Sequence, residues 1–295
     1  MNMLDVRSLY VTYLSEEERV EAVRGIDFSA EEGKVTGIVG ESGSGKSTAM
    51  LAVMGLLDHK AAVEAEKVSL FGNTVRAGDN AAIIFQDPLK CLNPTVKIGR
   101  QIAETVRNRK KCTWREAKKR SEELLDSVGI RHPRLRMKQY PFELSGGQKK
   151  RVAIAGVLAM NPKILILDEP TAGLDPKGRD DILDQIAELH KVRGITIVLV
   201  SHSMEDIAKY VERLIVMNHG EAVFDDTPKK VFSHYKELET MGLAAPQITY
   251  IMHALKEHGL NVDADATTVE EARDSILAAL KASDSPLLKE GGAEK

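Results

Sequence analysis

Short runs of aliphatic residues, each followed by a helix-forming stretch, recur along most of the chain. Three runs have the length and composition of strands buried on both faces: Val35–Val39, Ile164–Leu167 and Ile195–Val200. A stretch rich in Ala, Leu and Met at 48–57 follows the first run. After the second run, Asp175-Pro176 predicts a helix start, with Asp as the cap and Pro in the first helical position. This alternation predicts a mainly parallel sheet covered by helices on both faces.

The N-terminal part of the chain has a different pattern, in which polar and apolar residues alternate as they do in strands. Residues 4–7 and 20–23 show this alternation, and a charged turn at 15–19 separates them. Strand-like segments follow at 66–76 and at 81–85, the second of which ends at Phe85-Gln86. The sequence therefore predicts further strands before residue 86.

From residue 88 to about 136 the chain is helix-forming and basic. Thr113-Trp114-Arg115-Glu116 has the spacing of a capping box, which predicts a helix running toward Val128. The Lys- and Arg-rich stretch 107–120 is best interpreted as a solvated helix face, because no interleaved aromatic residues accompany it as they would in a nucleic-acid patch. Beyond Thr227-Pro228 the pattern is helical again, with a link near 243–247 and a last helix after Thr268.

Composition narrows the classes of protein that the chain can represent. Hydrophobic residues make up 43% of the 295 residues, which is enough for a sizeable core. The formal net charge of −3 provides no global positive field for nucleic acid or anionic lipid, and two cysteines fit a reducing compartment. No apolar run approaches the roughly 18 residues of a membrane span, and the N-terminus lacks a signal-peptide pattern. We therefore expect a cytoplasmic protein that reaches a membrane only through a partner.

A phosphate-binding loop follows the first buried strand. The motif is Gly40-Glu41-Ser42-Gly43-Ser44-Gly45-Lys46-Ser47, with Thr48 at the beginning of the helix behind it. Glycines let successive backbone N–H groups turn toward phosphate oxygens, and the helix N-terminus adds partial positive charge. Lys46 can reach the β- and γ-phosphates, and the Ser47 hydroxyl is placed to bind Mg²⁺. A glycine-rich turn without a ligand would have no use for Lys-Ser at this point.

Two acidic residues, Asp168 and Glu169, end the buried strand at 164–167. Parallel sheets present their ligands at the carboxyl ends of strands, so these carboxylates are placed to act on the same nucleotide. Asp168 would hold Mg²⁺ through its water shell, and Glu169 could polarise a water for attack on the γ-phosphate. Acids at a strand end are often only turn formers, and it is the phosphate-binding loop that favours the catalytic interpretation.

The segment Leu144-Ser145-Gly146-Gly147-Gln148 specifies the class further. Together with the phosphate-binding loop, Gln86, Asp168-Glu169, Gly173-Leu174-Asp175 and His202, it resembles the ABC-transporter ATPase family over about residues 3–225. The resemblance implies an α/β P-loop NTPase of the ABC-ATPase fold. Such a fold has a mainly parallel core sheet flanked by helices, an antiparallel β subdomain, a helical subdomain and, here, a short C-terminal helical extension.

The same resemblance implies a division of the chain. An ABC ATPase domain would occupy 1–240, with a helical subdomain at about 88–160 inserted in it. Residues 241–282 would form a C-terminal helical extension that could take part in dimerisation, and 283–295 a disordered tail.

Roles for individual residues follow from the resemblance as well. In a head-to-tail dimer, Ser145, Gly146, Gly147 and Gln148 of one subunit would cover ATP on the phosphate-binding loop of the other. Gln86 would contact Mg²⁺ and the attacking water, His202 the γ-phosphate, and Asp175 the dimer seam. Tyr13 stands where the family places an aromatic residue against adenine, although a strand residue packing on the sheet is the alternative. The implied cofactors are ATP and Mg²⁺.

The two halves of the chain resemble different branches of the family. Residues 3–147 are similar to the ATPases of oligopeptide, dipeptide and nickel importers, in phrases such as Phe85-Gln86-Asp87-Pro88 and Tyr140-Pro141-Phe142-Glu143-Leu144. From Gln148 onward the chain is similar to energy-coupling-factor ATPases, which drive vitamin and metal-ion uptake, as in Ser201-His202-Ser203-Met204-Glu205-Asp206. The cysteine cluster found near the C-terminus of many peptide-importer ATPases is absent, and the segment between the strands at 70 and 82 is short for that branch.

The resulting hypothesis is the ATP-hydrolysing subunit of an ABC importer, peripheral on the inner face of the cell membrane. Its partners would be a second ATPase subunit, identical or paralogous, and transmembrane permeases that contact 87–100; no nucleic acid is expected. The alternatives are a soluble ABC ATPase of DNA repair, chromosome organisation or translation, and an inert module with a degraded site. About a hundred residues separate Lys46 from Ser145, and they contain neither heptads nor a cysteine cluster, which disfavours a soluble ABC ATPase. The catalytic positions are not substituted, which disfavours an inert module.

Overall fold

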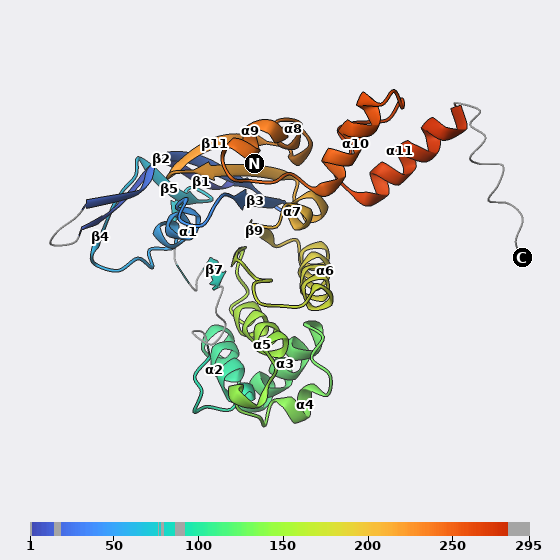
Figure 1. The fold of residues 1–295 in the computed structure, drawn as a ribbon. Coiled ribbons are helices and arrows are strands. Elements are labelled where there is room, and N and C mark those ends of the chain that lie inside the picture. The colour runs from blue at the N-terminus through green and yellow to red at the C-terminus, as the bar shows by residue number, and fades with distance from the viewer. Residues whose placement is uncertain (1, 15–18, 76, 78–79, 86–91, 283–295) are drawn as a thin grey trace, which may run out of the picture.

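The computed structural model describes residues 2–14, 19–75, 77, 80–85 and 92–282. Figure 1 shows three parts: two neighbouring sheets with their helices, a helical arm that extends from them, and a pair of C-terminal helices that project to one side. The chain passes from the sheets into the arm after β7 and returns to them at β8. The arm thus lies between β7 and β8 in the chain, and the division of the chain at 240 stays a prediction.

The core sheet consists of β3 (Val35–Val39), β7 (Ala81–Ile84), β8 (Ile164–Asp168), β9 (Thr196–Val200), β10 (Arg213–Asn218) and β11 (Glu221–Asp226), in the order β11-β10-β3-β9-β8-β7. All pairings are parallel except the β10–β11 hairpin. Every residue of β3, β7, β8 and β9 is buried, because helices or the second sheet cover both faces. The predicted mainly parallel sheet is confirmed.

The second sheet is antiparallel and is built on two long strands, β1 (Asn2–Leu14) and β2 (Arg19–Glu31), with β4 (Ala61–Glu64), β5 (Lys67–Leu70) and β6 (Asn73–Thr74) beside them. The expected single strand at 66–76 is divided here. A tight turn at Phe71 and Gly72, both with positive φ (49° and 75°), reverses the chain between β5 and β6. β1 and β2 are longer than the alternating segments, because register shifts let the pairing continue past breaks in the pattern.

Helix α1 (Lys46–Val53) follows β3 and is shorter than the stretch 48–57, because Gly55 takes a left-handed φ of 64° just past its end. Its buried residues pack with the second sheet on one face of the core sheet. The other face is covered by α6 (Pro176–Arg193), α7 (Met204–Tyr210), α8 (Pro228–Ser233), α9 (Tyr235–Thr240) and part of the arm. The carboxyl ends of β3, β8 and β9 therefore open toward the same edge of the sheet.

The arm contains α2 (Ile98–Lys110), α3 (Trp114–Ser127), α4 (Pro133–Arg136), the 3₁₀ turn η2 (Pro141–Glu143) and α5 (Gly146–Leu158). The predicted capping box opens α3: the Thr113 hydroxyl accepts from the Glu116 N–H, and the Glu116 carboxylate accepts from the Thr113 N–H. Hydrophobic residues of α2, α3 and α5 join the large core cluster beneath the sheet.

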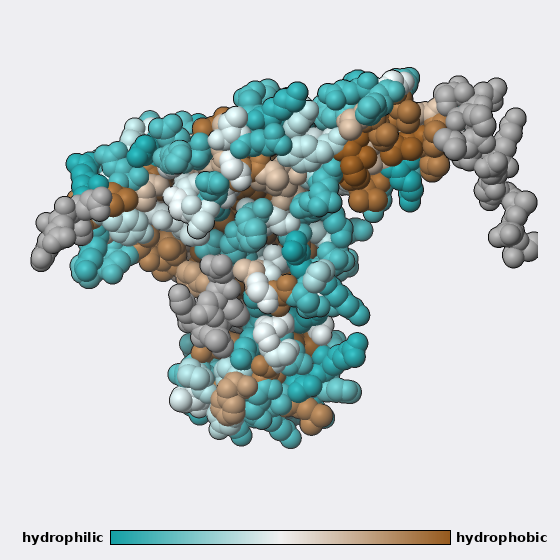
Figure 2. Space-filling model, viewed as in Figure 1, coloured by the Kyte–Doolittle hydropathy of each residue, from teal (hydrophilic) through white to brown (hydrophobic). Residues whose placement is uncertain are grey.

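The C-terminal helices are α10 (Gln247–Glu257) and α11 (Val269–Ala282). They bury a small cluster of their own around Met252, Val262, Ala266 and Ala272. Hydrophobic surface remains exposed over the two helices, as Figure 2 shows. The predicted tail at 283–295 lies outside the described residues. Within the described ranges, no helix has both the length and the hydropathy that a membrane crossing requires.

Candidate nucleotide-binding site

The glycine-rich loop between β3 and α1 adopts a conformation that only glycine allows at its critical positions. Gly45 has a φ of 95°, and a Cβ atom there would overlap the carbonyl oxygen of Ala22 on β2. At Gly40, a Cβ atom would overlap the carbonyl oxygen of Met217 at the end of β10. The loop is thus held between the two sheets, and its backbone lies close to both.

Lys46 is folded back over this loop. Its Nζ atom donates to the carbonyl oxygens of Gly40 (2.8 Å) and Glu41 (2.7 Å), and the side chain is almost fully buried. Burial lowers the pKa of Lys46, while the carboxylates of Glu169, Asp168 and Glu41 act in the opposite direction. The ammonium group is therefore a partly desolvated charge that an anion beside the loop would stabilise.

The hydroxyl of Ser47 donates to Oδ1 of Asp168 over 2.9 Å, which joins the start of α1 to the end of β8. Asp168 is buried, and this burial raises the pKa of its carboxyl group, against the lowering effects of the Ser47 hydrogen bond and the Lys46 charge. Because burial disfavours the charged form of this carboxylate, a cation bound beside it would stabilise that form. The sequence predicts both residues as metal ligands, and the structure brings them together.

Glu169 follows directly and lies in a left-handed backbone conformation with a φ of 50°, which is uncommon for a residue other than glycine. Its N–H donates to the carbonyl oxygen of Val200, so the end of β9 fixes its position. The turn separates the two adjacent carboxylates. Asp168 faces Ser47, whereas Glu169 faces His202, whose Nδ1 lies 2.7 Å from Oε2 of Glu169.

These groups border a single cavity of about 360 Å³. Its lining combines the glycine-rich loop, the start of α1 and the two residues beyond β8 and β9: Ala22, Gly40, Ser42, Gly43, Gly45, Lys46, Ser47, Thr48, Glu169 and His202. Backbone N–H groups at a helix start, a lysine and a hydroxyl form a binding site for a phosphate chain. The carboxylate and imidazole at the opposite side are placed to act on a water at the end of that chain.

The donor set fits a magnesium ion bound together with phosphates. Mg²⁺ usually binds through one or two protein ligands, phosphate oxygens and waters, and Ser47 with Asp168 supplies such ligands. In the part of the chain that the structure describes, no group of three or more His, Cys, Asp and Glu residues could hold a metal ion. A cation at this site would therefore depend on the phosphates for its remaining ligands.

Other predicted residues lie outside the cavity. Ser145 caps α5: its hydroxyl accepts from the Gln148 N–H, and the Gln148 side chain accepts from the Ser145 N–H. Gly146 opens the same helix, and Gly147 lies beside Leu174, next to Asp175. Asp175 stands at the N-cap of α6, as predicted, but makes no capping hydrogen bond with its side chain. Ser145, Gly146 and Asp175 are exposed, Gly147 and Gln148 are half-buried, and none of the five lines the cavity at the phosphate loop of their own chain.

Two further predictions have different outcomes. Tyr13 is not among the residues that line the cavity; it lies partly buried on β1 and packs against the core between the sheets, in keeping with the alternative considered for it. Gln86 lies outside the described residues.

Lys150 was missed by the sequence analysis. Its buried side chain reaches from α5 to the loop after Glu169, where Nζ donates to the carbonyl oxygens of Pro170 (2.9 Å) and Ala172 (2.5 Å). It therefore connects the helix that begins at Ser145 with the residues that follow the carboxylate pair. The run Gln148-Lys149-Lys150-Arg151 is typical of a solvated helix, so nothing in the sequence distinguishes this lysine.

Comparison with known proteins agrees with this geometry. Residues 23–172 match the ABC transporter family. The energy-coupling factor transporter ATP-binding protein EcfA2 of Clostridium tetani is 40% identical over 280 residues, which are 93% of this chain and 96% of the relative. The dipeptide transport ATP-binding protein DppD of Haemophilus influenzae is 40% identical over 254 residues, which are 82% of this chain and 77% of the relative.

Solved structures of similar fold include cbiO1 from Clostridium perfringens, described as part of the ABC transporter complex cbiONQ. It has a TM-score of 0.67 and 30% identity, and the match covers 86% of this chain and 99% of that one. A dimeric ATP-binding cassette in a post-hydrolysis state, bound to ADP and Pi, has a TM-score of 0.66 and 28% identity over 77% of this chain and 99% of its own.

The predicted resemblance to two branches of importer ATPases, the predicted fold and the predicted ATPase class are thereby confirmed. Both the family match and the similarity along nearly the whole length show that this chain belongs to the ABC transporter family, as an ATP-binding, ATP-hydrolysing protein.

Proposed function

We propose that the protein is the ATP-hydrolysing subunit of an ABC importer and energises solute uptake through partner permeases in the membrane. One observation carries the proposal: a single cavity is lined by Lys46, Ser47 and the Glu169–His202 pair, and Ser47 is hydrogen-bonded to Asp168. These are the groups that in-line attack of water on a bound triphosphate requires, namely a phosphate cradle, a cation site and a positioned base.

In this proposal the backbone of Gly40–Ser47 and the ammonium of Lys46 bind the β- and γ-phosphates, with Ser42 and Thr48 completing the cradle. Ser47, Asp168 and Gln86 hold Mg²⁺, which when bound supplies positive charge that stabilises the phosphates and the leaving group. The bonds from Lys46 to the Gly40 and Glu41 carbonyls are then exchanged for bonds to phosphate oxygens. That exchange provides the Lys46 charge with an anionic partner.

Glu169 acts as general base toward the attacking water, and its side chain is mostly sheltered from solvent at 12% exposure. His202 is far more accessible, at 69%, and contacts the γ-phosphate. Their hydrogen bond fixes the carboxylate at the edge of the phosphate cavity. In this proposal Glu169 accepts the proton from the water, and His202 holds the Glu169 carboxylate in position.

Two subunits form the complete site. The capped start of α5, at Ser145–Gln148, does not line the cavity at the phosphate loop of its own chain, which supports a role toward nucleotide on a second subunit. Asp175 accompanies it to the seam, and Tyr13 approaches the adenine on a closed dimer. Exposed apolar side chains on α10 and α11 support the predicted role of 241–282 in dimerisation: Ile251, Val269 and Leu277 are 49%, 66% and 40% exposed.

The membrane partner is a permease, and the protein is peripheral on the inner face of the membrane. We favour an assembly of the energy-coupling factor type, because the match spans 96% of the EcfA2 relative but 77% of the DppD relative. The segment 87–100 is the proposed contact with the permease, because in the sequence it directly follows Gln86, which is assigned to Mg²⁺ and the attacking water, and ends in α2 of the arm. Residues 87–91 of it lie outside the described ranges.

The phosphate cradle is tested with Lys46→Ala, by measuring ATP binding and hydrolysis. The control is Lys191→Ala, on the exposed end of α6. Lys46→Ala should lose ATP affinity and hydrolysis, whereas the control should retain both. Tight MgATP binding by Lys46→Ala would contradict the assignment.

Purification from native membranes in mild detergent, followed by mass spectrometry, tests the membrane partner. It should recover a permease with the protein, whereas recovery with ribosomes or DNA would favour the soluble alternative.

A further inference from the structure

A second pocket lies at the opposite edge of the core sheet from the nucleotide cavity. Its volume is about 520 Å³, and two of its lining residues, Lys163 and Ile195, directly precede β8 and β9. The nucleotide cavity lies beyond the carboxyl ends of the same two strands, at Glu169 and His202. Because each strand has five residues, its length of about 16 Å separates the two sites. A ligand in the second pocket would therefore not touch the nucleotide.

Three parts of the chain meet at this pocket. Arg120 comes from α3 in the helical arm, whereas Arg193 is the last residue of α6 and Lys163 ends the segment between α5 and β8. Glu32 follows β2, and Phe71 lies in the turn between β5 and β6, so both come from the antiparallel sheet. A ligand that contacts these residues would connect the arm to both sheets.

The pocket has an excess of positive charge. Arg120, Lys163 and Arg193 are cations, and Glu32 is the one carboxylate among the described residues that line the pocket. Arg120 forms an ion pair with Glu123 on its own helix, at 2.8 Å. Within the described ranges, Lys163 and Arg193 take part in no ion pair. Three cations less one carboxylate leave two positive charges for a ligand to neutralise.

Arg193 is held in an unfavourable environment for a charge. The residue is half-buried, and burial lowers the pKa of its guanidinium, while the nearby charge of Arg120 lowers it further. A guanidinium nevertheless stays protonated in proteins, so loss of a proton does not relieve this cost. An anion between Arg120 and Arg193 would relieve it, because it would pair with both charges. Phosphate suits this position, since guanidinium groups bind its oxygens through two parallel hydrogen bonds.

The rest of the lining suits a hydroxylated organic molecule. Phe71 and Ile195 provide apolar surface, while Asn161 provides an amide and Glu32 a carboxylate that can bond hydroxyl groups. Nζ of Lys163 lies 4.8 Å from the centre of the Phe71 ring, so cationic and aromatic surface adjoin each other. The volume is in the range of pockets for small organic ligands and is more than inorganic phosphate needs.

We infer that this pocket binds a small polyol phosphate, such as a sugar phosphate, and that the ligand holds the arm against the two sheets. Its phosphate group pairs with Arg120, Lys163 and Arg193, and its hydroxyl groups bond Asn161 and Glu32. A phosphate monoester carries about 1.5 to 2 negative charges at pH 7, which matches the charge excess of the pocket. The inference goes beyond the proposed function and does not depend on the identity of the permease or of the transported solute.

The experiment is isothermal titration calorimetry on the full-length protein in a buffer without phosphate. The probes are glucose 6-phosphate, ribose 5-phosphate and glycerol 3-phosphate. The pocket variant is Arg120→Gln/Arg193→Gln, and the matched control is Lys119→Gln/Lys191→Gln, which removes two charges from exposed positions of the same helices outside the pocket. The wild type should bind at least one probe at millimolar concentration. The pocket variant should bind that probe at least about tenfold more weakly, since charge-assisted bonds are lost, whereas the control should bind as the wild type does.

Further arms show where the probe binds and which part of it is recognised. Lys46→Ala alters the phosphate loop and should bind the probe as the wild type does. Loss of binding in Lys46→Ala would place the probe in the nucleotide cavity and overturn the inference. Unchanged binding by the pocket variant, or binding of none of the three probes by the wild type, would overturn it as well. Inorganic phosphate and glucose should each bind more weakly than glucose 6-phosphate, and equal binding of inorganic phosphate would exclude a role for the polyol.

Thermal unfolding separates a loss of binding from a loss of folding. Without a probe, the pocket variant should unfold at no lower temperature than the control, because Arg193 is an unfavourable charge in the free protein. The bound probe should raise the unfolding temperature of the wild type and not that of the pocket variant. Arg120→Gln alone, at a side chain that is 40% exposed, gives a second test that leaves the half-buried residue intact. Its binding should also weaken.

Failure of this inference is distinguishable from failure of the proposed function. The pocket variants keep every residue of the nucleotide cavity, so their basal ATP hydrolysis should equal that of the wild type. If the wild type hydrolyses ATP but binds no probe, the pocket inference is wrong and the ATPase assignment stands. If it binds a probe through Arg120 and Arg193 but does not hydrolyse ATP, the proposed function is wrong and the pocket inference stands.

Discussion

Nδ1 of His202 lies 2.7 Å from Oε2 of Glu169, so the second residue after β9 holds the carboxylate that follows β8. The two positions are 33 residues apart in the chain but adjacent in space, because β8 and β9 are neighbouring parallel strands that end at the same edge of the sheet. Their hydrogen bond holds the carboxylate at the cavity that Lys46 and Ser47 also line.

Glu169→Gln tests the proposed base. The amide keeps the shape of the side chain and can still bond His202, but it does not accept a proton. Turnover should fall by roughly 10²- to 10⁴-fold, because that is the usual contribution of a positioned base. ATP affinity, measured by equilibrium binding, should change little. A variant that hydrolyses ATP at the wild-type rate would remove the base from the mechanism.

Asp168→Asn tests the cost of burying a carboxylate. Burial raises the pKa of Asp168 above its ordinary value of 3.8, against the Ser47 bond and the Lys46 charge. The folded state then binds this proton more readily than the unfolded state, so the group's contribution to stability is present below pH 3.8 and is lost as the pH rises through the raised folded pKa. At neutral pH without Mg²⁺, Asp168→Asn should therefore be more stable than the wild type.

Thermal unfolding in EDTA measures this difference: Asp168→Asn should have the higher Tm at neutral pH, and the difference should shrink toward pH 4. MgATP should reverse the order, because the variant lacks the charge that a cation would bind. The exposed Asp126→Asn is the control and should show neither effect. Equal stabilisation of wild type and Asp168→Asn by MgATP would argue against Asp168 as a metal ligand.

Local patterns predict most of the nucleotide site, because its parts are short and self-contained. A buried strand, a glycine turn and a helix determine the positions of Gly40 to Ser47 without help from the rest of the chain, and the Thr113 capping box closes within four residues. The loop motif and the carboxylate at the strand end also predict that Ser47 and Asp168 share a cation. Their separation of 121 residues, and hence the hydrogen bond between them, follows only from strand order in the sheet.

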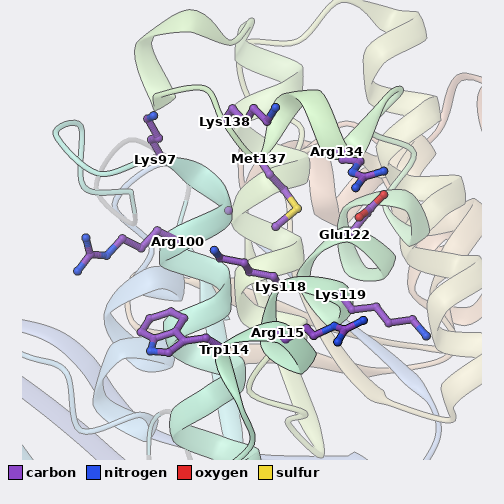
Figure 3. Close-up of a pocket in the computed structure, with 11 residues that line it drawn as sticks. Lys97, Arg100, Trp114, Arg115, Lys118, Lys119, Glu122, Arg134, Met137 and Lys138 are labelled. Carbon is purple, nitrogen blue, oxygen red and sulfur yellow. The ribbon is translucent and has the colours of Figure 1, made fainter.

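The features that the sequence does not predict depend on tertiary packing. Lys150 is one position in a charged run, and only the approach of the loop at 170–172 to α5 makes it a buried donor. A basic groove on the arm likewise forms where α2, α3 and α4 converge, and its cations, such as Lys97, Lys118 and Lys138, come from separate segments (Figure 3). Tyr13 packs partly buried against the core and does not line the cavity, so its contact with adenine stays a prediction. Side-chain type alone does not distinguish these environments.

Gly45→Ala tests the tight passage of the phosphate loop beneath β2. Alanine would have to keep a φ of 95°, at a cost of about 1–2 kcal/mol, and its Cβ would also overlap the carbonyl oxygen of Ala22. Gly33→Ala is the matched control, because Gly33 has a φ of 67° but open space where Cβ would lie. Urea unfolding should show a larger loss for Gly45→Ala, and only that variant should lose ATP binding. Equal effects of the two changes would show that the contact with Ala22 is unimportant.

Ser145→Ala separates the structural role of this serine from its proposed role toward a second subunit. Both Ser145 and Thr113 cap helices of the arm through reciprocal capping boxes, so Ser145→Ala and Thr113→Ala should each cost about 1 kcal/mol of stability. If Ser145 also contacts nucleotide across the dimer, only its loss should weaken ATP-driven association. Sedimentation of the two variants in a Glu169→Gln background, with MgATP, measures this. Wild-type-like dimers of Ser145→Ala would leave the serine as a cap alone, and the start of α5 would then need its backbone N–H groups to bind phosphate.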